Sequence, residues 1–217
     1  MFSRIPTSLK IDVNLDNRDS LRREIIEKYI HSKFNECYKA DIKHYLPYIL
    51  SIECNNGLCA TVGLNAAEKE LLYLEKYLPG PIEKEIARHA KKTIDRNKII
   101  EVGNLVSTWH GGSVIIFIIV AKLLSLIDRD WVVFTATDKV ISIMEKLSFK
   151  PVFLANATEA AIDNDQEKWG SYYNNNPRVM FGYIPDAVSI LKNNILLYST
   201  LSIFLIQVEE LANKFLS

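Results

Sequence analysis

The sequence has no excess of positive or negative charge. Lysine and arginine together number 26, and so do aspartate and glutamate, so the formal net charge is zero. With no long basic run either, the chain lacks the electrostatic footprint of a nucleic-acid-binding protein. Long apolar runs are also missing. The longest unbroken one, residues 114–121, is far shorter than the about 20 residues that span a bilayer.

Cysteines are few and odd in number. Cys37, Cys54 and Cys59 are all there are, and the first residues of the chain lack the apolar stretch of a secretion signal. We therefore expect reduced thiols and a cytoplasmic protein. One alternative stays open. If Asn56 and Gly57 form a two-residue hairpin turn, Cys54 and Cys59 lie opposite each other, close enough for a disulfide.

Several catalytic signatures are absent as well. The sequence contains no P-loop, no G-x-G-x-x-G, no G-x-S-x-G and no pair of histidines at metal-ligand spacing. These absences argue against kinase, hydride-transfer, serine-hydrolase and zinc-hydrolase functions. We expect no metal.

The apolar spacing that is present predicts an alternation of helices and strands. Strands are expected at 45–54, 58–64, 131–137, 152–155 and 178–184, and helices at 20–40, 67–78, 81–92, 140–147 and 195–216. Residues 99–127 are interpreted as a buried strand, a polar loop with two glycines and a very apolar helix. A hairpin followed by strand–helix crossovers predicts an α/β fold with a mixed sheet.

The length of 217 residues suits one domain with an appendage, which we place at 1–185 and 186–217. The appendage carries an apolar stripe at helical spacing over residues 195–216. Three interpretations are open: a helix packed on its own domain, a homodimer interface, or a membrane-surface helix. Its polar positions, among them Glu209, Glu210 and Lys214, are not basic, which argues against binding to anionic lipid.

Glu101 is the first candidate for chemistry. It lies among Ile99, Ile100 and Val102 in the central strand, and burial raises the pKa of a carboxyl group toward the range of a general base. The alternative is a structural carboxylate paired with a cation such as Arg96. A β-bulge near Gly103 would change which face the following side chains occupy and would turn backbone N–H groups into a cleft.

The loop after this strand is a candidate anion site. The backbone N–H groups of Gly111, Gly112 and Ser113 stand at the start of the apolar helix, where the phosphates of an acyl carrier would be stabilised. Two adjacent glycines that only make a turn are the alternative. His110 is either a proton carrier or an exposed loop histidine.

An aromatic cluster follows near residue 170. Trp169, Tyr172 and Tyr173, with Ser171 in the adjoining turn, would line an acyl or amine pocket. The alternative is that these rings belong to the hydrophobic core.

Five segments carry a family resemblance. LLYLEKYLPGPIE, EVGNLVS, WVVFTAT, FLANAT and WGSYYNNNPRVMFG, in this order, resemble the thermostable hemolysin family over about residues 35–184. That family is distantly similar to GNAT-like acyltransferases and acyl-homoserine-lactone synthases. The resemblance implies a GNAT-like α/β/α sandwich, with a mixed and mostly antiparallel central sheet, for residues 1–185.

The same resemblance implies transfer of an acyl group from a thioester to a small amine. Glu101 matches a carboxylate of the lactone synthases, whereas Asn104 stands where they usually have arginine. A backbone N–H beside Asn104 would stabilise the oxyanion. The donor is acyl-CoA or an acyl-carrier-protein thioester. Gly111 and Gly112 depart from the usual CoA-binding loop because no basic residue precedes them. The rival function is a membrane-active hemolysin or lipid-binding protein on this scaffold, without catalysis.

Overall fold

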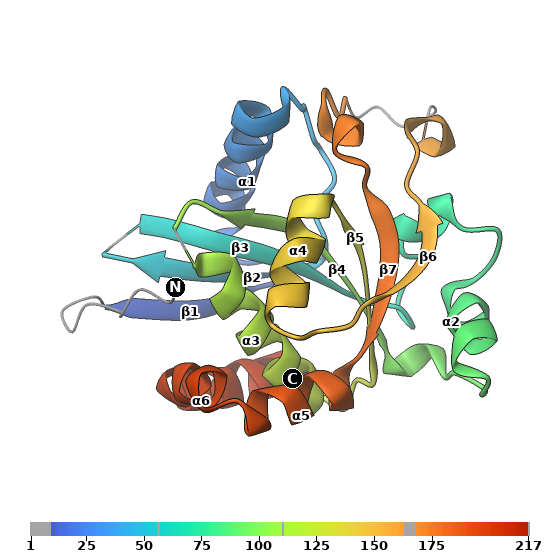
Figure 1. Cartoon of the computed structure of the whole chain (residues 1–217). Helices are drawn as coiled ribbons and strands as arrows, with labels where there is room; N and C mark the ends of the chain where they lie inside the picture. Colours follow the sequence, from blue (N-terminus) through green and yellow to red (C-terminus); the bar gives the residue numbers. More distant parts are fainter. Residues whose placement is uncertain (1–9, 56, 110, 163–167, 217) are drawn as a thin grey trace.

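One mixed sheet organises the protein (Figure 1). The structure, a computed structural model, describes residues 10–55, 57–109, 111–162 and 168–216. In this part of the chain the sheet has seven strands in the order β1-β2-β3-β4-β5-β7-β6. Only β4 and β5 are parallel neighbours, as expected for a mixed and mostly antiparallel sheet. The strands are β1 (Ile11–Asp16), β2 (Tyr48–Cys54), β3 (Gly57–Ala66), β4 (Ile99–Ser107), β5 (Trp131–Ala136), β6 (Val152–Asn156) and β7 (Arg178–Tyr183).

Helices cover both faces of this sheet. The α-helices are α1 (Arg23–Tyr38), α2 (Ile82–Ala90), α3 (Gly112–Leu126), α4 (Asp138–Lys146), α5 (Ile184–Asn193) and α6 (Ile195–Leu216). Short 3₁₀ helices are η1 (Tyr73–Tyr77), η2 (Arg96–Lys98), η3 (Glu159–Ile162) and η4 (Tyr172–Asn175). On one face α3 packs between the sheet and α6, whereas α1 contacts β3 and β4 from the other.

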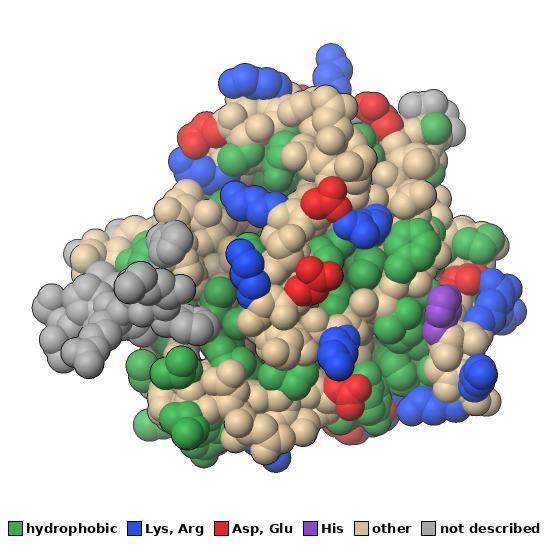
Figure 2. Space-filling model, in the orientation of Figure 1, with side chains coloured by type: hydrophobic (Ala, Val, Ile, Leu, Met, Phe, Trp, Pro, Cys, Tyr) green, Lys and Arg blue, Asp and Glu red, His purple; other side chains and the backbone are tan. Residues whose placement is uncertain are grey.

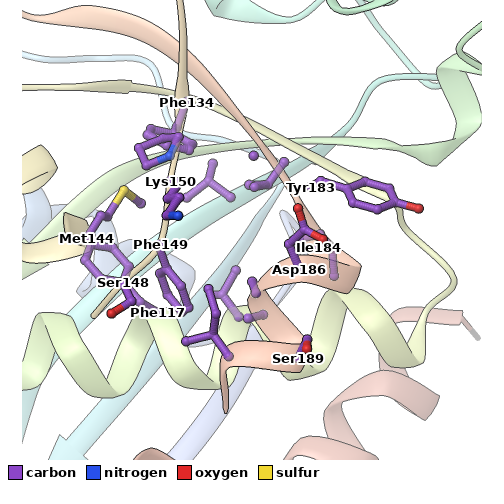
Figure 3. Close-up of a pocket in the computed structure, with 18 of the residues that line it drawn as sticks. Phe117, Phe134, Met144, Ser148, Phe149, Lys150, Tyr183, Ile184, Asp186 and Ser189 are labelled. Atoms are coloured by element: carbon purple, nitrogen blue, oxygen red, sulfur yellow. The ribbon is translucent and has the colours of Figure 1, made fainter. Parts of the chain in front are cut away.

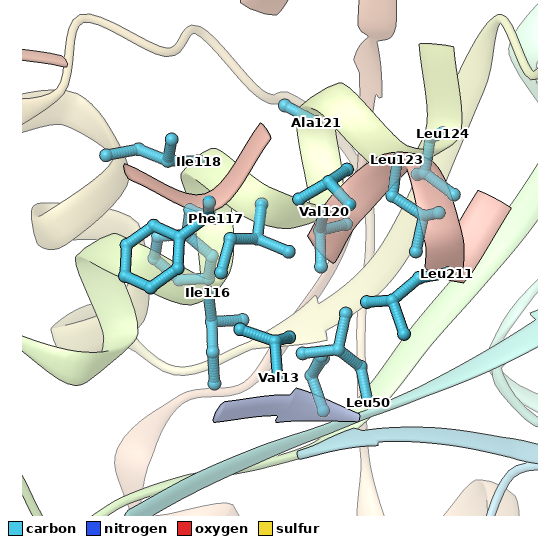
Figure 4. Packing of buried hydrophobic residues seen from close by; sticks show 14 of the residues in the cluster. Val13, Leu50, Ile116, Phe117, Ile118, Val120, Ala121, Leu123, Leu124 and Leu211 are labelled. Carbon is cyan, nitrogen blue, oxygen red and sulfur yellow. The ribbon is translucent and has the colours of Figure 1, made fainter. Parts of the chain in front are cut away.

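The position of α3 explains its composition. Ile116, Ile118 and Leu123 are fully buried, and side chains of α3 share one cluster with Leu50 of the sheet and Leu211 of α6 (Figure 4). A helix enclosed on most sides needs no polar face, so the apolar run is a core helix. The buried side of α6 in this cluster confirms that the tail packs on its own domain. The division of the chain at residue 185 stays a prediction.

The prediction of a helix at residues 67–78 is wrong. Only the short 3₁₀ helix η1 forms there. The backbone N–H groups of Tyr73 and Leu74 donate to the Glu101 carboxylate at 3.0 and 2.9 Å, and that of Leu72 donates to Glu75 at 2.8 Å. These donors have side-chain acceptors in place of the carbonyls of a preceding helical turn.

The other expected elements are confirmed within a few residues, but β1 and α5 were not predicted. Cys37, Cys54 and Cys59 are free thiols, so the alternative disulfide does not form. The predictions on Asn56 and His110 lie outside the described residues.

Candidate active site

The parallel strands β4 and β5 separate part-way along their length. Their pairing runs from Ile99 with Trp131 to Val102 with Phe134 and ends there. Both strands continue beyond this point, to Ser107 and Ala136. The separation opens the sheet at its centre.

The bulge expected near Gly103 is confirmed. β3 advances two residues from Thr61 to Gly63, while its partners on β4, Val106 and Gly103, are three apart. The extra residue lies at Asn104–Leu105, and Asn104 has a left-handed backbone with φ of 47°. Asparagine tolerates this conformation better than most residues. The extra residue interrupts the regular pairing beside the opening between the strands.

The Asn104 side chain stabilises the loop that precedes β2. Its Oδ1 accepts from the Leu46 N–H at 2.9 Å, and its Nδ2 donates to the His44 carbonyl at 3.3 Å. Gly63 leaves room for this contact, because a Cβ atom there would lie 2.8 Å from Asn104 Oδ1. The Asn104 amide is therefore engaged in structure. Its catalytic role, carried by the backbone beside it, stays a prediction.

Glu101 is buried beside this opening, with 4% of its surface exposed. Its carboxylate accepts the two N–H groups from η1 and lies 3.5 Å from Asn65 Nδ2. Burial outweighs these hydrogen bonds and raises the pKa of Glu101 to about 7. The alternative ion pair with Arg96 is wrong, since Arg96 instead binds Glu75 and Glu83, each at 2.7 Å.

A cavity of about 140 Å³ lies over Glu101 and the bulge. Trp169 and Tyr172 line it, together with Tyr73 of η1 and Phe34 of α1. Ser171 and Tyr173 line neither this cavity nor the second one described below. Ser171 Oγ donates to the Tyr38 carbonyl, and the Tyr173 and Tyr77 hydroxyls are 2.7 Å apart. The substrate role predicted for Ser171 and Tyr173 gains no support from their position.

A second cavity, of about 450 Å³, lies on the α3 side of the opening. Phe117, Met144 and Phe149 stand on one side of it and Ile184 and Asp186 on the other (Figure 3). Its exposed lining residues are polar and mark the mouth: Ser148, Lys150, Asp186 and Ser189. The rest of the lining is mostly apolar, as in sites that bury an apolar ligand.

The two cavities share four lining residues, Val102, Phe117, Phe134 and Met144. Val102 and Phe134 are the last paired residues before β4 and β5 separate. The shared wall therefore lies at the opening in the sheet. Sequence reasoning missed these four residues, because each occupies an apolar position that a core residue would also occupy.

The twin glycines lie at the start of α3, as expected. Gly111 is the N-cap with φ of 90°, and a Cβ on Gly112 would lie 2.5 Å from Ser107 Oγ. Both positions therefore favour glycine for steric reasons. Gly111, Gly112 and Ser113 line neither cavity, so their phosphate-binding role stays a prediction.

The comparisons with known proteins fit this geometry. The sequence model described as Thermostable hemolysin matches residues 16–188, which is most of the chain. The chain belongs to the thermostable hemolysin family. The match is wider than the resemblance over residues 35–184 and includes part of the N-terminal segment. No curated protein matches this hemolysin-family chain by sequence.

Solved structures of acyl-transferring synthases share the fold. FeeM, an N-acyl amino acid synthase from uncultured soil microbes, is 12% identical over 85% of this chain and 95% of its own, with a TM-score of 0.58. The acyl-homoserine-lactone synthase LasI is 10% identical over 81% and 90%, with a TM-score of 0.53. BjaI, a CoA-dependent acyl-homoserine-lactone synthase with SAM and isopentyl-CoA bound, is 8% identical over 84% and 89%, with a TM-score of 0.57. The hemolysin-family protein thus has a GNAT-like fold, and at these identities the likeness concerns the fold alone.

Proposed function

We propose that this protein transfers an acyl group from a thioester donor to a small amine. One observation carries the proposal: a mostly apolar cavity and a cavity containing a buried glutamate meet where β4 and β5 separate. A fatty chain fits the first cavity and an amine the second. The thioester carbon would then lie between them, beside the bulge.

Glu101 is the proton acceptor in this proposal. Its pKa of about 7 keeps a large fraction of the carboxylate ionised near neutral pH. The amine nitrogen attacks the thioester carbon, the C–N bond forms and the C–S bond breaks. Glu101 takes the proton that the amine loses and passes it to the departing sulfur, which leaves as a thiol, so that Glu101 is ionised again. A backbone N–H of the Asn104–Leu105 bulge stabilises the oxyanion, an effect worth about 3 kcal/mol in enzymes that use it.

The carrier end of the donor is assigned to the N-terminus of α3. Gly111, Gly112 and Ser113 offer backbone N–H groups there, and the helix dipole favours phosphate. CoA and the phosphopantetheine of an acyl carrier protein share this phosphate chemistry. BjaI and FeeM, which share this fold, are synthases of acylated products, and this likeness supports the proposal.

A donor panel tests the function directly. Purified protein is incubated with butanoyl, octanoyl, dodecanoyl and hexadecanoyl thioesters of CoA and of an acyl carrier protein, with and without a mixture of primary amines. We expect free thiol to appear in an amine-dependent way, and faster with the longer chains because they fill the apolar cavity. If no donor releases thiol above the rate without protein, acyl transfer by this site is refuted.

A second candidate function is contact with a membrane surface through α6. Apolar side chains gather on the surface over this helix, at the lower left of Figure 2. Ile195, Ile203 and Ile206 are 83%, 59% and 74% exposed. By length and composition alone α6 also passes as a membrane span, although a third of the tested window is buried in the fold. The nearby Glu209 and Glu210 disfavour anionic lipid, so a zwitterionic surface is the better match.

Replacing Ile203 and Ile206 with serine tests this candidate and leaves the buried side of α6 intact. We expect the double variant to lose binding to phosphatidylcholine vesicles, because about 3 kcal/mol of apolar burial would be removed. Co-sedimentation and dye leakage measure the effect. Ile25→Ser, at a 65% exposed position on α1, is the matched control. Equal vesicle binding by wild type and double variant would exclude α6 as the contact.

A further inference from the structure

Aromatic rings form a continuous belt around the smaller cavity. They come from α1, the loop before β2, η1 and the segment at residue 170, which are far apart in sequence. Ring centroids lie 5.1 Å apart for His44 and Tyr73, 6.2 Å for Tyr73 and Trp169, and 5.1 Å for Trp169 and Tyr172. The belt consists of Phe34, Tyr38, His44, Tyr73, Trp169 and Tyr172.

The charge in this cavity is one-sided. Glu101 is its only acidic lining residue, and no lysine or arginine lines it within the described part of the chain. Lys76 Nζ lies 4.2 Å from the centroid of the Tyr73 ring, and Arg23 donates to the Leu46 carbonyl at 2.7 Å, but neither cation lines the cavity. A carboxylate or phosphate bound here would be desolvated beside the Glu101 carboxylate, with no lining cation to pair with it.

A cationic or neutral ligand matches the same surroundings. Aromatic faces attract ammonium groups, and flat rings stack against aromatic side chains. An amino group directed at Glu101 would also be placed next to its proton acceptor. The cavity volume of about 140 Å³, against 450 Å³ for the apolar cavity, sets a small size for this ligand.

We propose that the acceptor is an arylalkylamine, that is, an amine with a flat aromatic body and no carboxylate or phosphate. The proposal rests on the acyl-transfer function proposed above and names its acceptor class. The proposed acceptor lacks the carboxylate of an amino acid and so differs from the acceptor expected for FeeM, an N-acyl amino acid synthase. The aromatic belt holds the ring of the acceptor, and Glu101 receives its amino group.

Matched ligand pairs test the proposal with the full chain. Tyramine is compared with tyrosine and phenethylamine with phenylalanine, because each pair differs only by the carboxylate, and butylamine serves as the amine without a ring. Binding is measured by calorimetry without a donor, and acylation by thiol release with a dodecanoyl thioester. We expect each arylalkylamine to bind roughly tenfold or more tightly than its amino acid and than butylamine.

Two variants of the cavity lining and one control variant extend the test. Trp169→Leu removes one ring of the belt and is expected to weaken tyramine binding roughly tenfold, whereas Tyr198→Leu on the exposed side of α6 leaves it unchanged. Thr135→Arg places a cation in the lining of the cavity. Because this cation can pair with a carboxylate, we expect the ratio of the tyramine affinity to the tyrosine affinity to fall.

The outcomes separate this inference from the function on which it rests. Tyrosine or butylamine binding as tightly as tyramine, or no amine binding at all, overturns the acceptor class. Tyramine binding with the expected preference but without thiol release supports the ligand class and refutes acyl transfer.

Discussion

Glu101→Gln is expected to lower kcat for amine-dependent thioester cleavage roughly 100-fold at pH 8, with little change in the KM for the thioester. An amide cannot take the proton that the attacking amine must lose, and general-base catalysis contributes about 10²–10⁴ in rate. The neutral side chain keeps the size of the original and can still accept one of the two N–H groups from η1. Steady-state kinetics with a dodecanoyl thioester measure the effect. An unchanged kcat would remove Glu101 from the mechanism.

The pH dependence separates a catalytic role of Glu101 from a purely structural one. The base must be ionised, so wild-type kcat/KM rises with pH and levels off above about 7, the raised pKa of Glu101. The variant profile should lack this rise. If Glu101 only anchored η1, its substitution would leave the shape of the pH profile unchanged.

The same pKa shift affects stability. Because burial raises the pKa of Glu101 from 4.5 to about 7, folding favours its protonated form. The stabilisation is fully present below the unfolded pKa of 4.5 and is lost as pH rises through the folded value, a difference of about 3 kcal/mol. The free energy of unfolding of Glu101→Gln, measured relative to that of wild type, should therefore increase as the pH is raised from 4 to 8. Thermal unfolding of both proteins at these two pH values checks the sign.

Local sequence was sufficient to predict the central strand and the burial of Glu101 within it. The apolar neighbours of Glu101 indicate burial, and burial is the main cause of its raised pKa. The hypothesis of a bulge near Gly103 was likewise local, since a glycine inside a strand often accompanies a bulge. Both conclusions depend on residues adjacent in the chain, which explains why they could be reached without coordinates.

The helix predicted at residues 67–78 does not form because backbone N–H groups there bind an acceptor that is distant in the sequence. The apolar spacing there is compatible with a helix, but two N–H groups of η1 donate to Glu101, nearly 30 residues away. No local pattern records such an acceptor. The α/β class itself could be predicted, because it follows from the order of the elements.

The cavities could not be predicted for a related reason. Val102 and Phe134 continue apolar strand patterns, and only the end of their pairing turns them into a cavity wall. Phe117 lies on a helix that is apolar nearly all round, so periodicity does not single it out. Whether an apolar residue fills a core or lines a space depends on neighbouring elements, which composition does not specify.

Filling the larger cavity should change the preference for donor chain length. Ala187 on α5 is partly buried and lines this cavity, so Ala187→Phe would place a ring where the distal methylenes of a long chain are proposed to lie. If the ring excludes about three methylenes, at about 0.8 kcal/mol each, the preference for dodecanoyl over butanoyl donors falls roughly 50-fold. Competition between the two donors measures the ratio directly. Ala160→Phe, at an exposed position on η3, is the control. Equal losses for both chain lengths would place the acyl chain elsewhere, whereas a loss confined to the long donor would support the α3 side of the opening as its binding site.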